Sequence, residues 1–401
     1  MRNSAGLLFW LAVRSAAQVA TVITLARALG PGQYGRFVAA IAIASGLGAI
    51  AGIGSQGLIL RDGARDPTRL DELLGRCLGL WLAGSAICTV AGVAAAALLP
   101  GPWSTRDLWL LIGSEVSTSS LVEILGRAMQ ARQYPQRYGA LSAGLTVCRL
   151  GALLLLMLLD ACTLRSWITA YAAASAGYGM LLLVQLGHRY PGVRLRRPDA
   201  ALLRAGAPFV AGSLGPRLQA EFNKPLLAQA SYGWAGNLSI AQRALDLATL
   251  PLVALQESLW PRVYSSRDPA ARLLHTGKWI VLLALLGGGL LLAVAPWLPR
   301  LLGADYASSS KLLAMLAGIP AMQVLRNLAS TQLIAKGRVA TLTRIQLTTM
   351  ALGALATASL VLSAGLAGAI MALYATEAAS LSMLLIASRS GKPSAHGPLQ
   401  G

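Results

Sequence analysis

Long apolar runs alternate with short, polar and mostly basic connections along the whole chain. A helix needs about 20 predominantly apolar residues to cross the hydrocarbon core of a bilayer. Runs that approach or exceed this length predict membrane-spanning helices at residues 6–29, 37–60, 77–99, 108–130, 138–160, 166–187, 203–230, 235–260, 278–299, 311–334, 341–363 and 365–387. We therefore expect an all-α integral membrane protein with about twelve transmembrane helices.

The longest and most basic connection, HRYPGVRLRRPDAALLR, divides these helices into two sets of six. The pattern predicts an N-terminal six-helix lobe at 1–188, a basic cytoplasmic linker at 189–202, a C-terminal six-helix lobe at 203–389 and a short cytoplasmic tail at 390–401.

The two halves share a short repeat around the turn between their first two helices. The matched positions are Gly32, Gly35 and Arg61 in the first half and, at one constant spacing, Gly233, Gly236 and Arg262 in the second. Because each half holds an even number of spans, the lobes have the same orientation. We expect them to be related as parallel repeats are in transporters, with a central cavity.

Lysine and arginine fall mainly in alternate connections, which orients the chain by the positive-inside rule. The connections predicted to face outward hold only Arg36, Arg106, Arg165, Arg300 and Lys311. Both termini are therefore predicted to be cytoplasmic.

Composition agrees with the membrane assignment. The chain is 55% hydrophobic and 12% charged, against about 25% charged residues in soluble domains. The net charge of +19 resides largely in the loops, so we expect membrane lipids as partners and no nucleic acid. The four cysteines lack CxxC spacing, the three histidines are scattered, and no GxxxxGK[ST] loop is present. We predict no metal, no cofactor and no enzymatic activity.

Ionisable residues within the predicted spans are the candidate site. Two stripes stand out: Arg217, Glu221 and Lys224 on the helix at 203–230, and Arg243, Asp246 and Glu257 on the helix at 235–260. An ionisable side chain in the bilayer costs at least ~2.5–3.5 kcal/mol, so it normally faces a bundle interior or a wet cavity. With a tight turn at Ser231–Gly236 between the helices, the stripes predict a polar cavity.

Further intramembrane residues complete the set. The candidate substrate-binding residues are Arg14, Gln18, Arg149, Arg217, Lys224, Arg243 and Arg326. The candidate coupling or ion-pair acids are Glu115, Glu221, Asp246 and Glu377. The planar guanidinium group of arginine matches the geometry of phosphate oxygens. The candidate set contains six cations and four acids, which is an excess of positive charge. This excess favours a multivalent anion as the substrate.

Structural roles are the alternative for each of these residues. The Arg217–Glu221–Lys224 stripe can neutralise itself and tie helices together, and Arg243 with Asp246 forms an i, i+3 pair. Arg14 has no acid near it in sequence, which favours a cavity role. Prolines at 208, 216 and 225 in one helix and at 251 in the next predict bends that either gate the cavity or are fixed by packing.

Two segments carry a resemblance to a known family. LARALGPGQYGRFVAAIAIASGLGAIAGIGSQGLILRD is similar to the opening of Wzx-type polysaccharide flippases. LLRAGAPFVAGSL and LLAQASYGWAGNLSIAQRALDLATLPLVALQESLWPRV resemble the seventh and eighth helices of that family. Its superfamily also includes the lipid II flippase MurJ and the MATE multidrug exporters.

The resemblance implies a two-lobed transporter in the bacterial inner (cytoplasmic) membrane. Such proteins pass a polyprenyl-diphosphate-linked oligosaccharide to the outer leaflet for O-antigen, capsule or exopolysaccharide synthesis, with a polymerase and glycosyltransferases as partners. The main alternative is a MATE-like exporter of small molecules or drugs. Many such exporters use an acidic site in their first two helices, but here no Asp or Glu occurs before Asp62. A glycosyltransferase or polymerase would need a long outer loop or a DxD-like cluster, and a scaffold would not need intramembrane charges.

Overall fold

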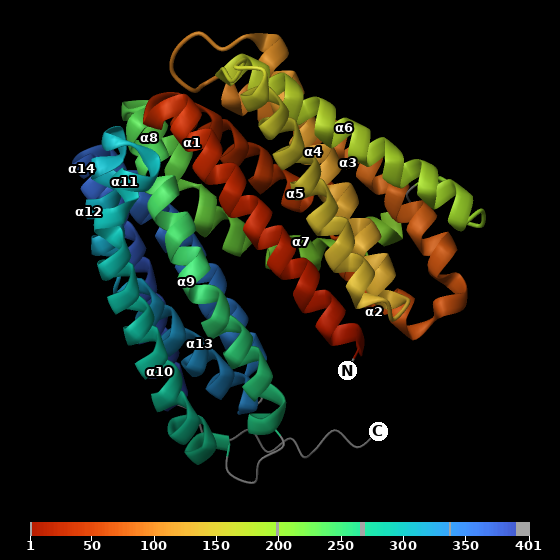
Figure 1. The fold of residues 1–401 in the computed structure, drawn as a ribbon. Helices are drawn as coiled ribbons and strands as arrows, with labels where there is room; N and C mark the ends of the chain where they lie inside the picture. Colours follow the sequence, from red (N-terminus) through yellow and green to blue (C-terminus); the bar gives the residue numbers. More distant parts are fainter. Residues whose placement is uncertain (1, 198–199, 265–268, 337, 390–401) are drawn as a thin grey trace. The chain divides into compact units, whose positions relative to one another are not determined.

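The computed structural model describes residues 2–197, 200–264, 269–336 and 338–389. Within these ranges the chain is helical and contains no strand. It forms two compact units, residues 1–236 and 237–401, which Figure 1 colours from red to blue along the sequence. The first unit thus extends past the basic connection, because helices after it pack against α1 and α2. The predicted lobes at 1–188 and 203–389 are defined by the number of helices and by the sequence repeat, and not by packing. They therefore stay a prediction.

The first predicted span, 6–29, and most of the second, 37–60, lie in one kinked element, α1 (Arg2–Ala51). Gly30 has a φ of 69°, which favours glycine, and Pro31 follows as the first residue of the next helix. The prediction of one continuous helix over residues 37–60 is wrong. Gly54 has a φ of 75° and Ile53 one of 48°, so the chain turns there before α2 (Ser55–Arg65).

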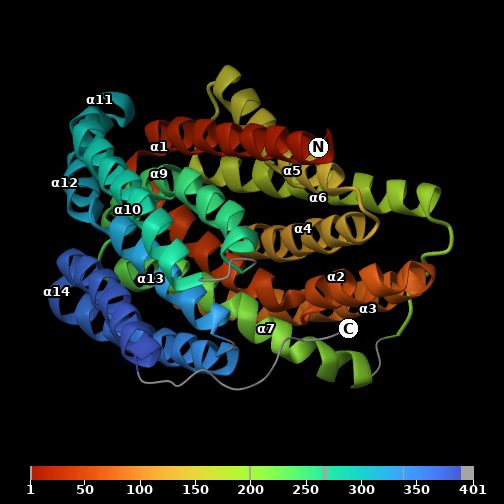
Figure 2. The ribbon, with the colours of Figure 1, turned by 90° about the horizontal axis from the view of Figure 1, so that it is seen from below.

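Four helices of the first unit correspond to predicted spans. They are α3 (Leu70–Ala96), α4 (Thr105–Ala131), α5 (Pro135–Leu158) and α6 (Leu164–Arg189). Three of them have both ends within three residues of the prediction, whereas α3 begins seven residues before its predicted start. α4 packs against α1, α2, α3, α5 and α6, and α1 also lies along α5 (Figure 2). The core between α2, α3 and α4 contains Leu58, Ile59, Leu74 and Ile124, each at most 1% exposed. The central α4 can therefore present polar side chains to several helices at once.

The predicted span 203–230 is two helices, α7 (Ala200–Glu221) and α8 (Asn223–Ala230), separated at Phe222. Pro225 has no N–H for the carbonyl of Glu221, which accounts for a break at this point. Only Ser231 lies between α8 and α9 (Tyr232–Tyr264). The predicted turn at Ser231–Gly236 is therefore shorter than expected.

The second unit contains α9 from Asn237 onwards, α10 (Pro269–Val294), η2 (Ala295–Trp297), α11 (Leu298–Leu302), η3 (Ala304–Tyr306), α12 (Ala307–Leu316), α13 (Ile319–Ala335) and α14 (Val339–Arg389). The predicted span 311–334 is divided at Ala317 and Gly318 into α12 and α13. α14 contains the last two predicted spans, because Gly365 turns the chain with a φ of 55°.

The described helices confirm a multi-pass membrane protein. Eight segments among them are long and apolar enough to cross a membrane. Two of the eight, Gly6–Arg65 and Ala340–Ser388, contain the kinks at Gly30 and Gly365, and each is long enough for one crossing on either side of its kink. The charged helices α7 to α9 are outside the eight. The described arrangement is consistent with twelve crossings.

Candidate functional site

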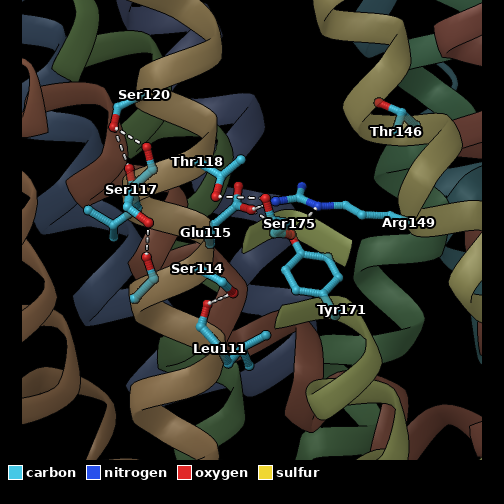
Figure 3. Close-up of polar contacts among 12 residues, drawn as sticks. Leu111, Ser114, Glu115, Ser117, Thr118, Ser120, Thr146, Arg149, Tyr171 and Ser175 are labelled. Atoms are coloured by element: carbon cyan, nitrogen blue, oxygen red, sulfur yellow. Dashed lines mark hydrogen bonds and ion pairs between the residues drawn. The ribbon is translucent and has the colours of Figure 1, made fainter. Parts of the chain in front are cut away.

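A buried ionic cluster in the first unit joins α4 to α5. Nη2 of Arg149 lies 2.7 Å from Oε2 of Glu115, and the two side chains are only 14% and 11% exposed. Glu115 projects from the centre of α4, and Arg149 from the facing side of α5 (Figure 3). The structure therefore brings together one predicted cation and one predicted acid.

Two residues of α6 complete this cluster. Tyr171 donates a hydrogen bond to Oε2 of Glu115 at 2.5 Å, and Nε of Arg149 donates to Oγ of Ser175 at 2.9 Å. Tyr171 and Ser175 are four residues apart, so they share one helix face. The Arg149 guanidinium carbon also lies 4.1 Å from the centroid of the Tyr171 ring. We call Glu115, Arg149, Tyr171 and Ser175 the α4–α6 cluster.

The α4–α6 cluster satisfies its own charges. A buried ion pair is tolerated when additional hydrogen bonds satisfy its remaining polar atoms. Here the carboxylate accepts from arginine and tyrosine, and the guanidinium has a carboxylate, a hydroxyl and an aromatic face. Arg149 is consequently held by the protein, and in this conformation its charge is already balanced.

The second unit contains another intramembrane ion pair. Nη1 of Arg326 on α13 lies 3.1 Å from Oε1 of Glu377 on α14, with side chains 26% and 11% exposed. The adjacent Asn327 donates to Gln256 of α9 at 3.1 Å. Oε2 of Glu377 is buried and has no hydrogen-bond partner within the described ranges. This pair is therefore less completely satisfied than the α4–α6 cluster.

The α7–α8 break decides how the first predicted stripe is paired. Nζ of Lys224 lies 2.5 Å from Oε2 of Glu221, and the side chains are 4% and 16% exposed. Arg217 is exposed and belongs to no ion pair among the described residues. Within the stripe, which the sequence allowed to neutralise itself, Glu221 is therefore paired with Lys224 and not with Arg217.

The second stripe is only loosely paired. Nη1 of Arg243 is 3.8 Å from Asp246, and the side chains are 36% and 65% exposed. An exposed pair of this kind typically contributes less than about 1 kcal/mol. The side chain of Glu257 lies outside the described residues.

Arg14 and Gln18 are half-buried on α1. Arg14 lies within electrostatic range of Tyr138, whose hydroxyl donates to Glu123 at 3.4 Å. Glu123 is already paired with Arg127 at 2.8 Å. Among the described residues, Arg14 belongs to no ion pair.

The ion pairs show which of the predicted cations account for the excess positive charge. Among the described residues, four of these cations pair with a predicted acid: Arg149 with Glu115, Lys224 with Glu221, Arg243 with Asp246, and Arg326 with Glu377. Within the described ranges, Arg14 and Arg217 have no acidic partner. The excess positive charge of the candidate set therefore resides on these two arginines.

Tyr171 and Ser175 were not among the residues predicted from the sequence. Their i, i+4 spacing on one face was a visible signal, but it did not show that this face meets Glu115. A further polar group, formed by Arg36, Trp103 and Tyr232, was also not identified.

Comparison with known proteins identifies solved structures with a similar fold. No family model and no curated protein matches the chain. Among solved structures it is similar to the lipid II flippase MurJ in an inward closed conformation, with a TM-score of 0.75, 12% identity and coverage of 97% of this chain and 87% of that one. It is also similar to an inward-facing multidrug resistance MATE transporter of the MOP superfamily, with a TM-score of 0.72, 14% identity and 94% of both chains covered. The MATE transporter DinF-BH in complex with R6G matches with a TM-score of 0.63 at 15% identity, over 96% of this chain and 93% of that one.

These likenesses extend over nearly the whole chain, at identities that show the fold alone. The described residues have an all-α, multi-pass membrane fold. That fold is the one that MATE transporters and MurJ have in common. The narrower resemblance to Wzx-type flippases stays a prediction.

Proposed function

We propose that this protein is a flippase. It moves a polyprenyl-diphosphate-linked oligosaccharide across the bacterial inner membrane for surface polysaccharide synthesis. The observation that carries the proposal is the charge balance: Arg14 and Arg217 have no acidic partner among the described residues, whereas the other four candidate cations do.

Unpaired arginines suit a diphosphate headgroup. Arginine presents donors in a rigid fork that matches phosphate oxygens, and the interaction strengthens where water is scarce. Arg149 and Arg326 would have to exchange a carboxylate for the substrate, which costs the stabilisation of a buried pair. We therefore assign the headgroup first to Arg14 and Arg217, with Gln18 beside Arg14 contributing hydrogen bonds to sugar hydroxyls.

The remaining predicted residues take supporting roles in this proposal. The paired acids Glu115, Glu221, Asp246 and Glu377 hold their helices and neutralise nearby cations. Glu377 is the best candidate for a coupling residue, because one of its carboxylate oxygens has no hydrogen-bond partner within the described ranges. Glycosyltransferases and a polymerase are the expected partners, since they would supply and consume the flipped lipid.

Export of small molecules by a MATE-like mechanism is the second candidate. The likeness to MATE transporters favours it. A cationic drug, however, would be repelled by Arg14 and Arg217, whereas an anionic headgroup would be attracted. The two candidates thus differ in the charge of the substrate.

Reconstitution into liposomes tests the choice. We expect purified protein to move a fluorescent polyprenyl-diphosphate oligosaccharide between leaflets, measured as protection of the fluorophore from an impermeant quencher. A matched lipid with a neutral headgroup should not move. Transport of a cationic dye with no movement of the diphosphate lipid would instead support the exporter.

A further inference from the structure

Three segments of the first unit meet at residues 30–36, 98–103 and 229–236. The hydroxyl of Tyr232, at the start of α9, donates to the carbonyl oxygen of Pro100 at 2.6 Å. It also accepts a hydrogen bond from Nε1 of Trp103 at 3.1 Å. Gln229 of α8 donates to the carbonyl of Leu98 at 3.2 Å. The α8–α9 turn is thereby bound to the connection between α3 and α4.

Arg36 of α1 adds the third segment. Its guanidinium donates to the carbonyl of Pro102 and lies 4.5 Å from the centroid of Trp103 and 6.0 Å from that of Tyr232. We call Arg36, Trp103 and Tyr232 the clasp. Nε of Arg36 is buried with no hydrogen-bond partner among the described residues. The clasp is therefore held by specific contacts but leaves one buried donor unsatisfied.

Two glycines bring the backbones of the clasp together. A Cβ added to Gly35 would overlap the carbonyl of Tyr232, and one added to Gly236 would overlap the carbonyl of Pro31. Gly35 and Gly236 are equivalent positions of the sequence repeat. Within the first unit, the repeat-related helical segments of α1 and α9 therefore pack directly against each other, at a distance that only glycine permits.

The clasp lies next to a break in the helix that carries Arg217. α8 is eight residues long, with the Phe222 break at one end and Ser231 at the other. Movement at Phe222 would carry α8 and Tyr232 away from Pro100 and Trp103 without bending a continuous helix. The α1 kink at Gly30 provides a similar hinge for Arg36.

We propose that the clasp is a gate at the end of the protein predicted to face outward. It holds the α8–α9 turn against α1 and the α3–α4 connection, and it must open for substrate to leave. The proposal rests on the proposed function, in that it names the contacts that transport must break. Arg36 and Tyr232 are then gating residues that do not touch the substrate.

Distance measurements on spin-labelled protein test the gate without substrate. Labels are attached to cysteines at the exposed positions Thr105 and Trp234, in a chain with alanine at the four native cysteines. Tyr232→Phe keeps the ring and removes both hydrogen bonds of the hydroxyl. Since one net hydrogen bond changes an equilibrium constant by about 2- to 10-fold, we expect the ratio of long to short distances to rise by about 4- to 100-fold.

Tyr178→Phe is the matched control, because the Tyr178 hydroxyl makes a single hydrogen bond to Leu141 elsewhere in the same unit. It should leave the distance distribution unchanged. If Tyr232→Phe gives the wild-type distribution, or if the control shifts it equally, the clasp is fixed packing and the proposal fails. Because no substrate is present, this result is independent of whether the flippase assignment is correct.

Crosslinking provides a second test that needs no destabilising substitution in the clasp. Cysteines at Leu98 and Gln229, joined by a short reducible bifunctional reagent, should stop flipping, and reduction should restore it. A crosslinked protein that flips lipid at the uncrosslinked rate would overturn the gate. Wild-type flipping in the same liposomes shows separately whether the proposed function holds.

Discussion

Removal of Arg149 should destabilise the first unit, mainly because it leaves the carboxylate of Glu115 without its partner. The pair is 2.7 Å apart and its side chains are 14% and 11% exposed, so water compensates poorly. At an effective dielectric constant of 20, two unit charges about 4 Å apart interact by about 4 kcal/mol. Breaking a buried pair by removing one partner typically costs about 3–5 kcal/mol. We therefore expect Arg149→Met to lower the free energy of unfolding by about 3–5 kcal/mol.

The double variant separates this effect from lost packing. Glu115→Gln combined with Arg149→Met removes both charges, and the amide oxygen of the introduced glutamine can still accept the hydrogen bond from Tyr171. We expect this variant to lie within about 2 kcal/mol of wild type, since replacing both members of a buried pair is often nearly neutral. The measurement is denaturant-induced unfolding in mixed micelles across the full double-mutant cycle. Additive single effects, or a cost below about 1 kcal/mol for Arg149→Met, would show that the Arg149–Glu115 ion pair does not stabilise the first unit.

Other predictions follow from the pairing and the topology. Lys224→Ala should lower the thermal midpoint, because it leaves the buried carboxylate of Glu221 without a partner, whereas Arg217→Ala should not lower it. The double variant Lys224→Ala with Glu221→Ala should recover most of the loss. Equal destabilisation by Arg217→Ala and Lys224→Ala would contradict the pairing. Gly365→Ala should destabilise the second unit by at least about 1 kcal/mol, because a φ of 55° with a ψ of −126° disfavours any side chain, whereas Gly289→Ala, in open space on α10, should not. Single cysteines near Trp103 and near Arg194 should react from opposite sides of the membrane with an impermeant thiol reagent, and labelling of the Arg194 position from outside intact cells would reverse the orientation.

The helices could be predicted from sequence wherever hydrophobic length alone decides. α3 to α6 follow apolar runs bounded by polar turns, and the ends of α4, α5 and α6 lie close to the predicted ones, whereas α3 begins seven residues early. The break at 52–54 was not predicted, because Gly52, Ile53 and Gly54 fit an apolar run as well as they fit a turn. Their backbone conformation depends on packing against other helices, which hydropathy does not express.

The sequence was enough to name candidate residues for the site, but it did not show which of them contact one another. On a continuous helix, Arg217 and Lys224 are both close enough to reach Glu221, being four and three residues away. The break at Phe222 favours Lys224, and Pro225 alone did not show which partner it would select. Tyr171 and Ser175 needed knowledge of which face of α6 meets α4, information that a single sequence does not contain.

The measurement closest to the central claim is flipping of a polyprenyl-diphosphate oligosaccharide by protein carrying Arg14→Ala or Arg217→Ala. Loss of one bidentate contact to phosphate, a charge-assisted bond worth about 1.5–3 kcal/mol, should reduce flipping by about 10-fold or more while the thermal midpoint stays near wild type. Lysine at the same position should restore only part of the activity. Arg106→Ala, which removes an exposed arginine at the start of α4, is the control and should flip at the wild-type rate. Wild-type flipping by well-folded Arg14→Ala and Arg217→Ala proteins would contradict the claim that the two unpaired arginines bind the headgroup.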